Sequence, residues 1–172
     1  LDACRYDIFE QIVSLDGRLE SRISRGSTSP EWVSGNFKNK LLHDTVYVSA
    51  NIWYSRLEED LNSDVHDFIG TNSDDVPGEL NPAARHLAGR GMHPQTITRL
   101  ATEAMEQYPN KRFIIHYMQP HQPYIGSQGA RHFEAEGNTI SRFAAGERPA
   151  SIDTLREAYA ENLEVVLEYI PE

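Results

Sequence analysis

Apolar residues recur with helical spacing in three parts of the chain, and this pattern predicts three amphipathic helices. The first covers residues 3–14, the second begins at Pro94, and the third follows Ser151. The hydroxyl of Ser151 is suited to accept a hydrogen bond from the first turn of that helix. A shorter helix is predicted from Pro30 to about Asn39, because proline favours the first turn of a helix.

Runs of apolar and β-branched residues predict the strands. Residues 45–50 form one such run, and residues 112–118 form the strongest, which we expect to be central in a parallel sheet. Residues 18–24 alternate between apolar and polar side chains, which predicts a half-buried strand. Residues 51–93 and 125–150 lack clear periodicity and are expected to be long polar loops.

Strands that alternate with helices predict an α/β fold, in which a mostly parallel sheet is flanked by helices. At 172 residues, the chain has room for one domain of this kind with a substantial core. Ligands of such sheets bind beyond the carboxyl ends of the strands. The segments that follow Ser24, Ala50 and Met118 are therefore expected to share one rim.

The charge of the chain restricts its partners. It carries 26 acidic and 16 basic residues, for a net charge of −10, and only three of the basic residues are lysines. Acidic surfaces with more arginine than lysine are typical of halophilic proteins, because many carboxylates hold hydration and repel one another. No basic stripe is available to release counterions from nucleic acid, so we expect no nucleic-acid partner.

Cys4 is the one cysteine of the chain, which excludes an internal disulfide and favours a reducing, cytoplasmic compartment. No stretch is long and apolar enough to cross a membrane, and no signal peptide is visible. The chain begins at Leu1 without a start methionine and stops at Glu172 directly after a predicted helix. We therefore expect both ends to be cut, and a further strand, targeting segment or membrane anchor could lie outside the sequence.

A cluster of hydroxyl residues, Ser27–Ser29, lies between a predicted strand and the helix predicted at Pro30. Hydroxyl oxygens at such a junction are exposed and have backbone N–H groups nearby, which suits a nucleophile or a bound anion. The alternative is ordinary helix capping before Pro30 and Glu31. The two interpretations are compatible, because Thr28 can both cap the helix and act as the nucleophile.

Two further positions carry candidate chemistry. Asp2 offers a carboxylate for a hard cation, or alternatively caps a helix. His121 lies between Pro120 and Pro123, which restrict the backbone and so fix the direction of the histidine. A histidine held in this way suits a metal ligand, an acid or a donor to an anion, and the alternative is a structural turn residue. His116, within a predicted strand, is interpreted as a core histidine bonded to the backbone.

Four short segments stand in an order and at spacings that together characterise a family. They are Leu1–Asp7, Gly26–Trp32, His116–Tyr124 and Tyr159–Leu163. They resemble successive motifs of the alkaline phosphatase superfamily, and most closely the sulfatase-like hydrolases of salt-loving archaea. The last segment is similar to the stretch that precedes the second metal motif of the family, so the resemblance spans nearly the whole chain.

The resemblance implies an alkaline phosphatase-like fold and a metal-dependent hydrolase or transferase of phosphate or sulfate esters. Asp2 matches the first metal-binding aspartate, and Thr28 matches the nucleophile, which also contacts the metal. His121 matches the histidine that contacts the transferred group. In the mechanism that we expect, His121 together with Arg25 or Arg5 offsets negative charge on that group. The implied cofactor is a divalent cation (Mn, Zn, Mg or Ca), and the implied substrate is a small-molecule, glycan-linked or lipid-linked ester.

The chain departs from that family at three places. Many sulfatases have a second aspartate where this chain has Ala3. Sulfatases that use formylglycine need Cys or Ser at the nucleophile and Arg four positions later, where this chain has Thr28 and Trp32. The Asp-His-Gly metal motif of the family does not occur in the sequence, so we expect an incomplete domain that lacks part of the metal site and is inactive alone.

These departures favour phosphate over sulfate. We therefore expect the intact protein to transfer phosphate through a covalent threonine intermediate. The alternatives are sulfate ester hydrolysis through an unmodified hydroxyl, and a family member that has lost catalysis and serves as a binding domain. Ala3 and the acidic surface are compatible with the last of these.

Overall fold

The structure, a computed structural model, describes residues 1–71, 93–134 and 138–170. Within these residues the fold is α/β, and the sheet contains three parallel strands in the order β2-β1-β3. The strands are β1 (Leu41–Ser49), β2 (Asp64–Gly70) and β3 (Arg112–His116). The predicted α/β class and parallel sheet are confirmed, but β1 rather than β3 is the central strand.

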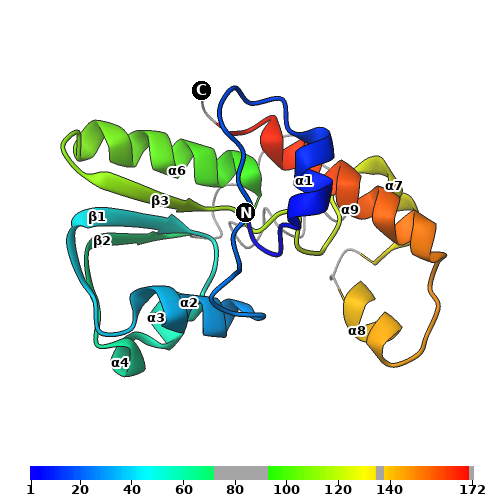
Figure 1. Cartoon of the computed structure of the whole chain (residues 1–172), viewed down its shortest axis with the longest axis horizontal. Helices are drawn as coiled ribbons and strands as arrows, with labels where there is room; N and C mark the ends of the chain where they lie inside the picture. Colours follow the sequence, from blue (N-terminus) through cyan, green and yellow to red (C-terminus); the bar gives the residue numbers. More distant parts are fainter. Residues whose placement is uncertain (72–92, 135–137, 171–172) are drawn as a thin grey trace.

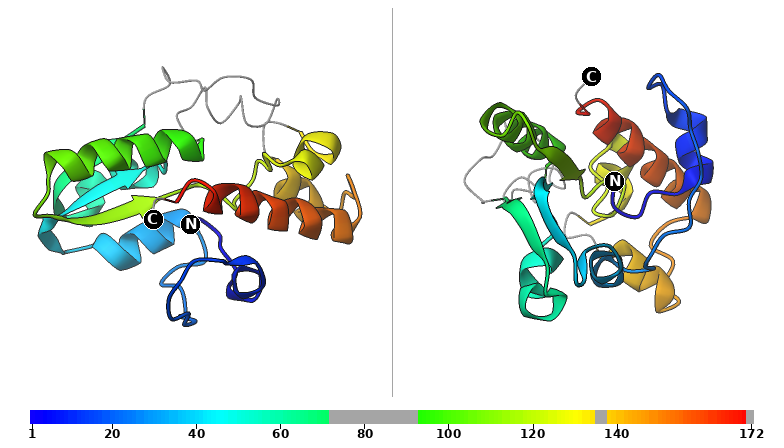
Figure 2. Two further views of the ribbon diagram at one scale, coloured as in Figure 1. Left: turned by 90° about the horizontal axis from the view of Figure 1, so that it is seen from above. Right: turned by 60° about the vertical axis from the view of Figure 1, so that its left-hand side comes forward.

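Helices cover both faces of the sheet, as Figures 1 and 2 show from three directions. They are α6 (Pro94–Gln107) on one face, and α2 (Ser29–Phe37), α3 (Trp53–Arg56) and α4 (Glu58–Leu61) on the other. Successive side chains of a strand point to opposite faces. Val46 and Val48 therefore join the core beneath α6, whereas Tyr47 stacks on Phe37 of α2 with ring centroids 4.9 Å apart.

A second group of helices lies beyond the carboxyl ends of the strands (Figure 1). It contains α1 (Tyr6–Ile12), α7 (Ser127–His132), α8 (Thr139–Ala144) and α9 (Ile152–Leu167). One apolar core joins α9 to the sheet, because Leu163 and Val166 of α9 pack with Ala50, Tyr117 and Met118. This core holds α9 against the segments that leave β1 and β3.

Several expected elements are confirmed. The helix predicted at Pro94 is α6, and the helix predicted after Ser151 is α9. Ser151 caps α9 as expected, since its hydroxyl accepts from the N–H of Thr154 at 3.0 Å. The helix predicted at residues 3–14 is shorter, at Tyr6–Ile12.

Other expectations are wrong. Residues 18–24 form no strand; all of them are exposed, and alternation cannot stabilise a strand that has no hydrogen-bonded neighbour. Residues 51–71, expected to begin a long loop, contain α3, α4 and β2, and the rest of that predicted loop, 72–92, lies outside the described residues. The other expected loop, 125–150, contains α7 and α8, with 135–137 outside the described residues.

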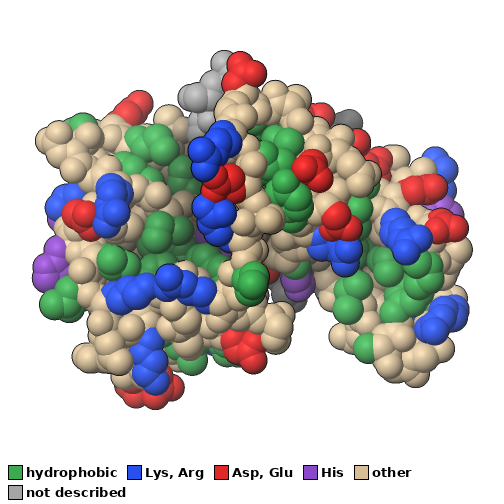
Figure 3. Space-filling view, viewed as in Figure 1, with side chains coloured by type: hydrophobic (Ala, Val, Ile, Leu, Met, Phe, Trp, Pro, Cys, Tyr) green, Lys and Arg blue, Asp and Glu red, His purple; other side chains and the backbone are tan. Residues whose placement is uncertain are grey.

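One face of the molecule carries side chains of both charge signs (Figure 3). Figure 3 shows acidic and basic side chains interspersed over the face viewed. A block of one sign, which would attract a highly charged partner, is not visible on that face. Among the helices of the described residues, none is both long and apolar enough to span a bilayer.

Candidate active site beyond the strand ends

Asp2 lies where the start of the chain runs beside the segment that leaves β3. Its N–H donates to the carbonyl of Tyr117 at 2.9 Å, and its own carbonyl accepts from the N–H of His121 at 3.2 Å. A parallel bridge with Pro120 accompanies these hydrogen bonds. Two segments far apart in the sequence thus bring Asp2 and His121 together at the rim where α/β sheets bind ligands.

The Asp2 carboxylate is largely buried, with 12% of its side chain exposed. Three groups contact its Oδ2 atom: Ser29 Oγ and Asn51 Nδ2 each donate at 3.0 Å, and His116 Nε2 lies at 3.4 Å. Burial alone would raise the pKa of Asp2. The hydrogen bond and charge of His116, then the charge of His121 and the Ser29 hydroxyl, outweigh burial and lower the pKa. Asp2 is therefore an anion at neutral pH.

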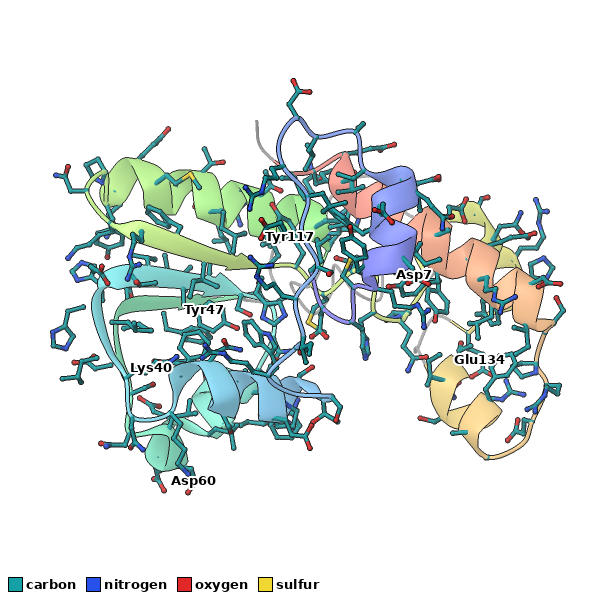
Figure 4. All side chains as sticks on the ribbon, viewed as in Figure 1. Asp7, Lys40, Tyr47, Asp60, Tyr117 and Glu134 are labelled. Carbon is teal, nitrogen blue, oxygen red and sulfur yellow. The ribbon has the colours of Figure 1, made fainter. Side chains whose placement is uncertain are left out.

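His116 connects Asp2 to the interior of the protein. Its Nδ1 atom lies 2.8 Å from the hydroxyl of Tyr47, which Figure 4 labels on the α2 side of β1. The carboxylate of Asp2 can only accept, so Nε2, which faces Asp2, carries a proton. Burial raises the pKa of Tyr47, so the phenol keeps its proton and can donate to Nδ1. The expectation that His116 bonds to the backbone is wrong, because both ring nitrogens contact side chains.

The hydroxyl residues form the start of α2. Thr28 is the N-cap, and Glu31 completes a capping box with it. The Glu31 carboxylate accepts from the N–H of Thr28 at 3.2 Å, and from the hydroxyl and N–H of Ser27 at 2.6 and 2.9 Å. These hydrogen bonds, first that of the Ser27 hydroxyl, lower the pKa of Glu31. The N–H groups of Ser27 and Thr28 are thus occupied by Glu31, and Pro30 has none to offer an anion.

The hydroxyl that contacts Asp2 belongs to Ser29. Ser29 is half-buried, and its hydrogen bond to Asp2 spans 27 positions of sequence. Thr28 is exposed and lines the same pocket as Asp2 and Ser29. The turn therefore places two neighbouring hydroxyl residues at the pocket that Asp2 also lines.

A pocket of about 1100 Å³ opens beside these residues. Its polar lining includes Asp2, the hydroxyl turn and His121, and its apolar lining includes Trp32 and Ile115. The pocket brings together Asp2, Thr28, Arg25 and His121, four of the five residues that the sequence nominates for the site. It is large enough for a small phosphate ester.

His121 has one ring nitrogen engaged. Nδ1 lies 2.6 Å from the carbonyl oxygen of Gln122, which can only accept, so Nδ1 carries the proton. The Nε2 atom has no hydrogen-bond partner among the described residues, so it can take part in chemistry at the pocket. The peptide bonds that precede Pro120 and Pro123 are both cis.

The two arginines predicted to assist His121 are placed differently. Arg25 lines the pocket, and its guanidinium donates to the carbonyl of Gly35 at 3.2 Å. Arg5 forms a bidentate pair with Asp7, labelled on α1 in Figure 4, at 3.0 and 2.7 Å. More than half of each side chain of this pair is exposed, at 68% and 56%. Arg25 therefore remains a candidate for binding an anion, whereas Arg5 is paired at the surface.

Sequence reasoning missed Asn51 as part of the site. Asn51 is 3% exposed, and its Oδ1 accepts from the N–H of Trp53 at 2.9 Å while its Nδ2 donates to Asp2. One signal could have found it, because Asn51 directly follows a predicted strand and so stands on the expected rim. The role of His116 had no such signal, since the sequence does not show which side chains a buried histidine meets.

Asp2 offers part of a site for a divalent cation. All three side-chain contacts within the described residues reach Oδ2, so Oδ1 keeps its lone pairs for a hard ion. Thr28 and His121 line the same pocket. Nowhere in the described residues, however, are three acidic, histidine or cysteine side chains arranged to hold a metal. The donors fit part of a coordination shell and need further ligands to complete it.

Comparisons with known proteins found no relative: no family model, no curated protein and no solved structure matches this chain. The α/β class is shown by the parallel sheet and its flanking helices. The function is therefore inferred from the geometry of the pocket and from the motifs that line it.

Proposed function

We propose that this protein is a metal-dependent hydrolase or transferase of phosphate esters, with Thr28 as its nucleophile. The hydrogen bond from Ser29 Oγ to Asp2 Oδ2, at 3.0 Å, is the observation that carries the proposal. It joins the hydroxyl turn to an ionised, largely buried carboxylate beside a pocket that His121 also lines. Hydroxyl, carboxylate and imidazole around one cavity are suited to nucleophilic transfer.

Asp2 and the Thr28 hydroxyl would hold the cation, and further ligands would complete its coordination shell. Oxygen ligands suit Mg²⁺, Ca²⁺ and Mn²⁺, and Zn²⁺ also accepts a carboxylate oxygen. When bound, the cation would lower the pKa of the Thr28 hydroxyl and offset negative charge on the ester. Asn51 and His116 both contact Oδ2 of Asp2, so the carboxylate keeps one orientation.

In the proposed reaction, Thr28 Oγ attacks the phosphorus, and the Oγ–P bond forms as the bond to the leaving alkoxide breaks. Thr28 loses one proton to solvent, and the leaving alkoxide gains one. Water then attacks the phosphorus, the Oγ–P bond breaks and Thr28 recovers its proton; an acceptor alcohol in place of water gives transfer. His121 protonated at Nε2 donates to a non-bridging oxygen, and Arg25 adds positive charge to the pocket wall.

Two features favour phosphate over sulfate as the transferred group. Thr28 cannot be oxidised to the formylglycine aldehyde that many sulfatases need. Trp32, at the position where those sulfatases have arginine, packs on His116 with ring centroids 5.2 Å apart. That position therefore contributes packing rather than the positive charge of an arginine.

The test is a comparison of Thr28→Ala, Thr28→Ser and Ser29→Ala in the full-length protein. Each variant is assayed on aryl phosphate mono- and diesters and on aryl sulfate, with Mn²⁺ or Zn²⁺. We expect Thr28→Ala to lose at least about 100-fold in kcat and Thr28→Ser to retain most of it. Ser29→Ala should lose only about tenfold, because it removes one hydrogen bond that orients Asp2.

Acid quenching followed by peptide mass spectrometry locates the covalent intermediate. Phosphate on Thr28 supports the proposal, and phosphate on Ser29 would move the nucleophile by one residue. Turnover that is unchanged in Thr28→Ala, with no phosphopeptide from the turn, would rule out the mechanism. Faster turnover of aryl sulfate than of aryl phosphate would favour the sulfatase alternative.

A further inference from the structure

Two polar residues of α9 contact the segments that carry Asp2 and His121. Tyr159 and Asn162 are three positions apart, so their side chains lie on one face of the helix. Asp2 and His121 are more than a hundred positions apart in sequence. A single helix therefore contacts both halves of the proposed site.

Asn162 holds the segment that carries His121. Its Nδ2 donates to the carbonyls of Pro120 and His121, each at 3.1 Å, and its Oδ1 accepts from the N–H of Ile125 at 2.8 Å. The side chain of Asn162 is 0% exposed. A buried amide whose donors and acceptor are engaged leaves the backbone on both sides of His121 one low-energy position, because any shift would leave polar groups unpaired.

Tyr159 holds the segment that carries Asp2. Its hydroxyl accepts from the N–H of Arg5 at 2.8 Å and donates to the carbonyl of Ala3 at 2.8 Å. Burial raises the pKa of Tyr159 to about 12, so the hydroxyl keeps the proton that it donates. The backbone directly after Asp2 is thus tied to the same helix as the backbone of His121.

We infer that Tyr159 and Asn162 are positioning residues, which use the rigid spacing of α9 to set where Asp2 and His121 stand relative to each other. Neither side chain is among those that line the pocket, so they act through the backbone of the two segments rather than on a ligand. Two backbone hydrogen bonds, between Asp2 and Tyr117 and between Asp2 and His121, join these segments directly. The side chains of Tyr159 and Asn162 add a link between them through α9. Only the expected effect on phosphate affinity rests on the proposed function; the positioning role itself does not.

The experiment compares Asn162→Asp and Tyr159→Phe with two controls on the same helix, Leu163→Val and Glu164→Gln. Asn162→Asp keeps the shape but turns the donor toward Pro120 and His121 into a carboxylate oxygen, which repels their carbonyls. Leu163→Val removes core packing without touching either segment's hydrogen bonds, and Glu164 is exposed. If Asn162→Asp does not fold, the milder variant Asn162→Ser takes its place. It should then shift the ring signals of His121 and weaken phosphate binding in the same direction.

The readouts are the ¹⁵N shifts of the His121 ring, hydrogen exchange of the Arg5 amide, and affinity for inorganic phosphate. Asn162→Asp should shift the ring signals of His121 and weaken phosphate binding about tenfold. Tyr159→Phe should speed exchange of the Arg5 amide about tenfold and leave the His121 ring signals in place. The two control variants should change neither the His121 ring signals and phosphate affinity nor the exchange of the Arg5 amide.

Ring signals of His121 that are the same in Asn162→Asp and in the wild type would overturn the inference. So would equal changes in Leu163→Val, because the effect would then be general loss of packing. A wild-type protein that binds no phosphate, while Asn162→Asp still shifts the His121 signals, leaves the positioning role intact and counts against the proposed function instead.

Discussion

Helices α2 and α7 begin with the same capping chemistry, but the capping carboxylate comes from a different distance in the sequence. At the start of α2, Glu31 accepts from the Ser27 hydroxyl at 2.6 Å and from the Ser27 N–H at 2.9 Å. At the start of α7, Glu161 accepts from the Ser127 hydroxyl at 2.6 Å and from the Gln128 N–H at 2.7 Å. Glu31 belongs to the helix that it caps, whereas Glu161 belongs to α9, 33 positions after Gln128.

The difference shows how the two helix starts are held. The start of α2, which carries the hydroxyl residues Ser27–Ser29, is capped locally and can form without another helix. α7 has only six residues, too few to be stable in isolation, and its cap exists only when α9 is docked. α9 also holds the segment that carries His121, through Asn162, whereas the turn that carries Thr28 is capped by its own helix.

The largest expected effect comes from two glycines at which an added Cβ would meet backbone atoms. Gly26 precedes α2, and Gly129 lies in the first turn of α7. A Cβ at Gly129 would lie 2.2 Å from the carbonyl oxygen of Tyr124, and one at Gly26 would lie 2.3 Å from the Trp32 nitrogen. We expect Gly129→Ala and Gly26→Ala each to lower the free energy of unfolding by about 3 kcal/mol, because backbone must move. Urea denaturation followed by circular dichroism measures this, with the exposed Ser21→Ala as control. A loss no greater than that of Ser21→Ala would contradict it.

A second contrast is between two tyrosine hydroxyls, one with a hydrogen-bond partner far away in the sequence and one with a partner nearby. The Tyr47 hydroxyl bonds to His116, 69 positions away, whereas the Tyr6 hydroxyl bonds to Glu10 one helical turn away at the surface. Tyr47→Phe should lower the free energy of unfolding by about 2 kcal/mol, because His116 Nδ1 is left buried without its donor. Tyr6→Phe should cause no measurable change. Equal urea midpoints for the two variants would show that the Tyr47–His116 link contributes nothing.

The cap from α9 also predicts a pH dependence. Partial burial acts to raise the pKa of Glu161, but hydrogen bonds from Ser127 and Gln128 outweigh it and lower the pKa below its ordinary value of 4.5. A lowered folded-state pKa stabilises the protein above pH 4.5, and this contribution is lost as the pH falls through the folded-state value. Glu161→Gln should therefore cost about 1 kcal/mol at pH 7, kept small by solvent exposure.

Urea midpoints at pH 7 and at pH 3 measure this effect. The difference between the wild type and Glu161→Gln should shrink toward zero at the lower pH. Glu164→Gln, an exposed change on the same helix, is the control and should show no such trend. A difference that stays constant across this range would remove the ionised carboxylate as the source of the stability.

The smallest effect is expected at the local cap. Glu31→Gln keeps an acceptor for the hydrogen bonds from Ser27 and Thr28, so stability should change less than in Glu161→Gln. The substitution removes a negative charge beside the hydroxyl turn, so inorganic phosphate should bind about two- to threefold more tightly at low salt. Calorimetric titration checks this, and weaker binding would place the phosphate away from the turn.

Local patterns were enough to predict much of this protein. Helical spacing located α6 and α9, apolar runs located β1 and β3, and alternation of strands with helices predicted the α/β class. Short-range chemistry was equally readable: the caps at Ser151 and Thr28 involve residues within one turn. The motifs also nominated Asp2, Thr28, Arg25 and His121, which one pocket brings together.

Tertiary structure decided which side chains these groups meet. The contacts from Ser29, Asn51 and His116 to Asp2, and from Asn162 to the His121 segment, span 27 to 114 positions of sequence. Such partners depend on how helices dock on the sheet, which periodicity does not encode. The same limit explains why residues 18–24 looked like a strand: the sequence shows which face of a segment is apolar, but only the fold supplies the neighbour that a strand requires.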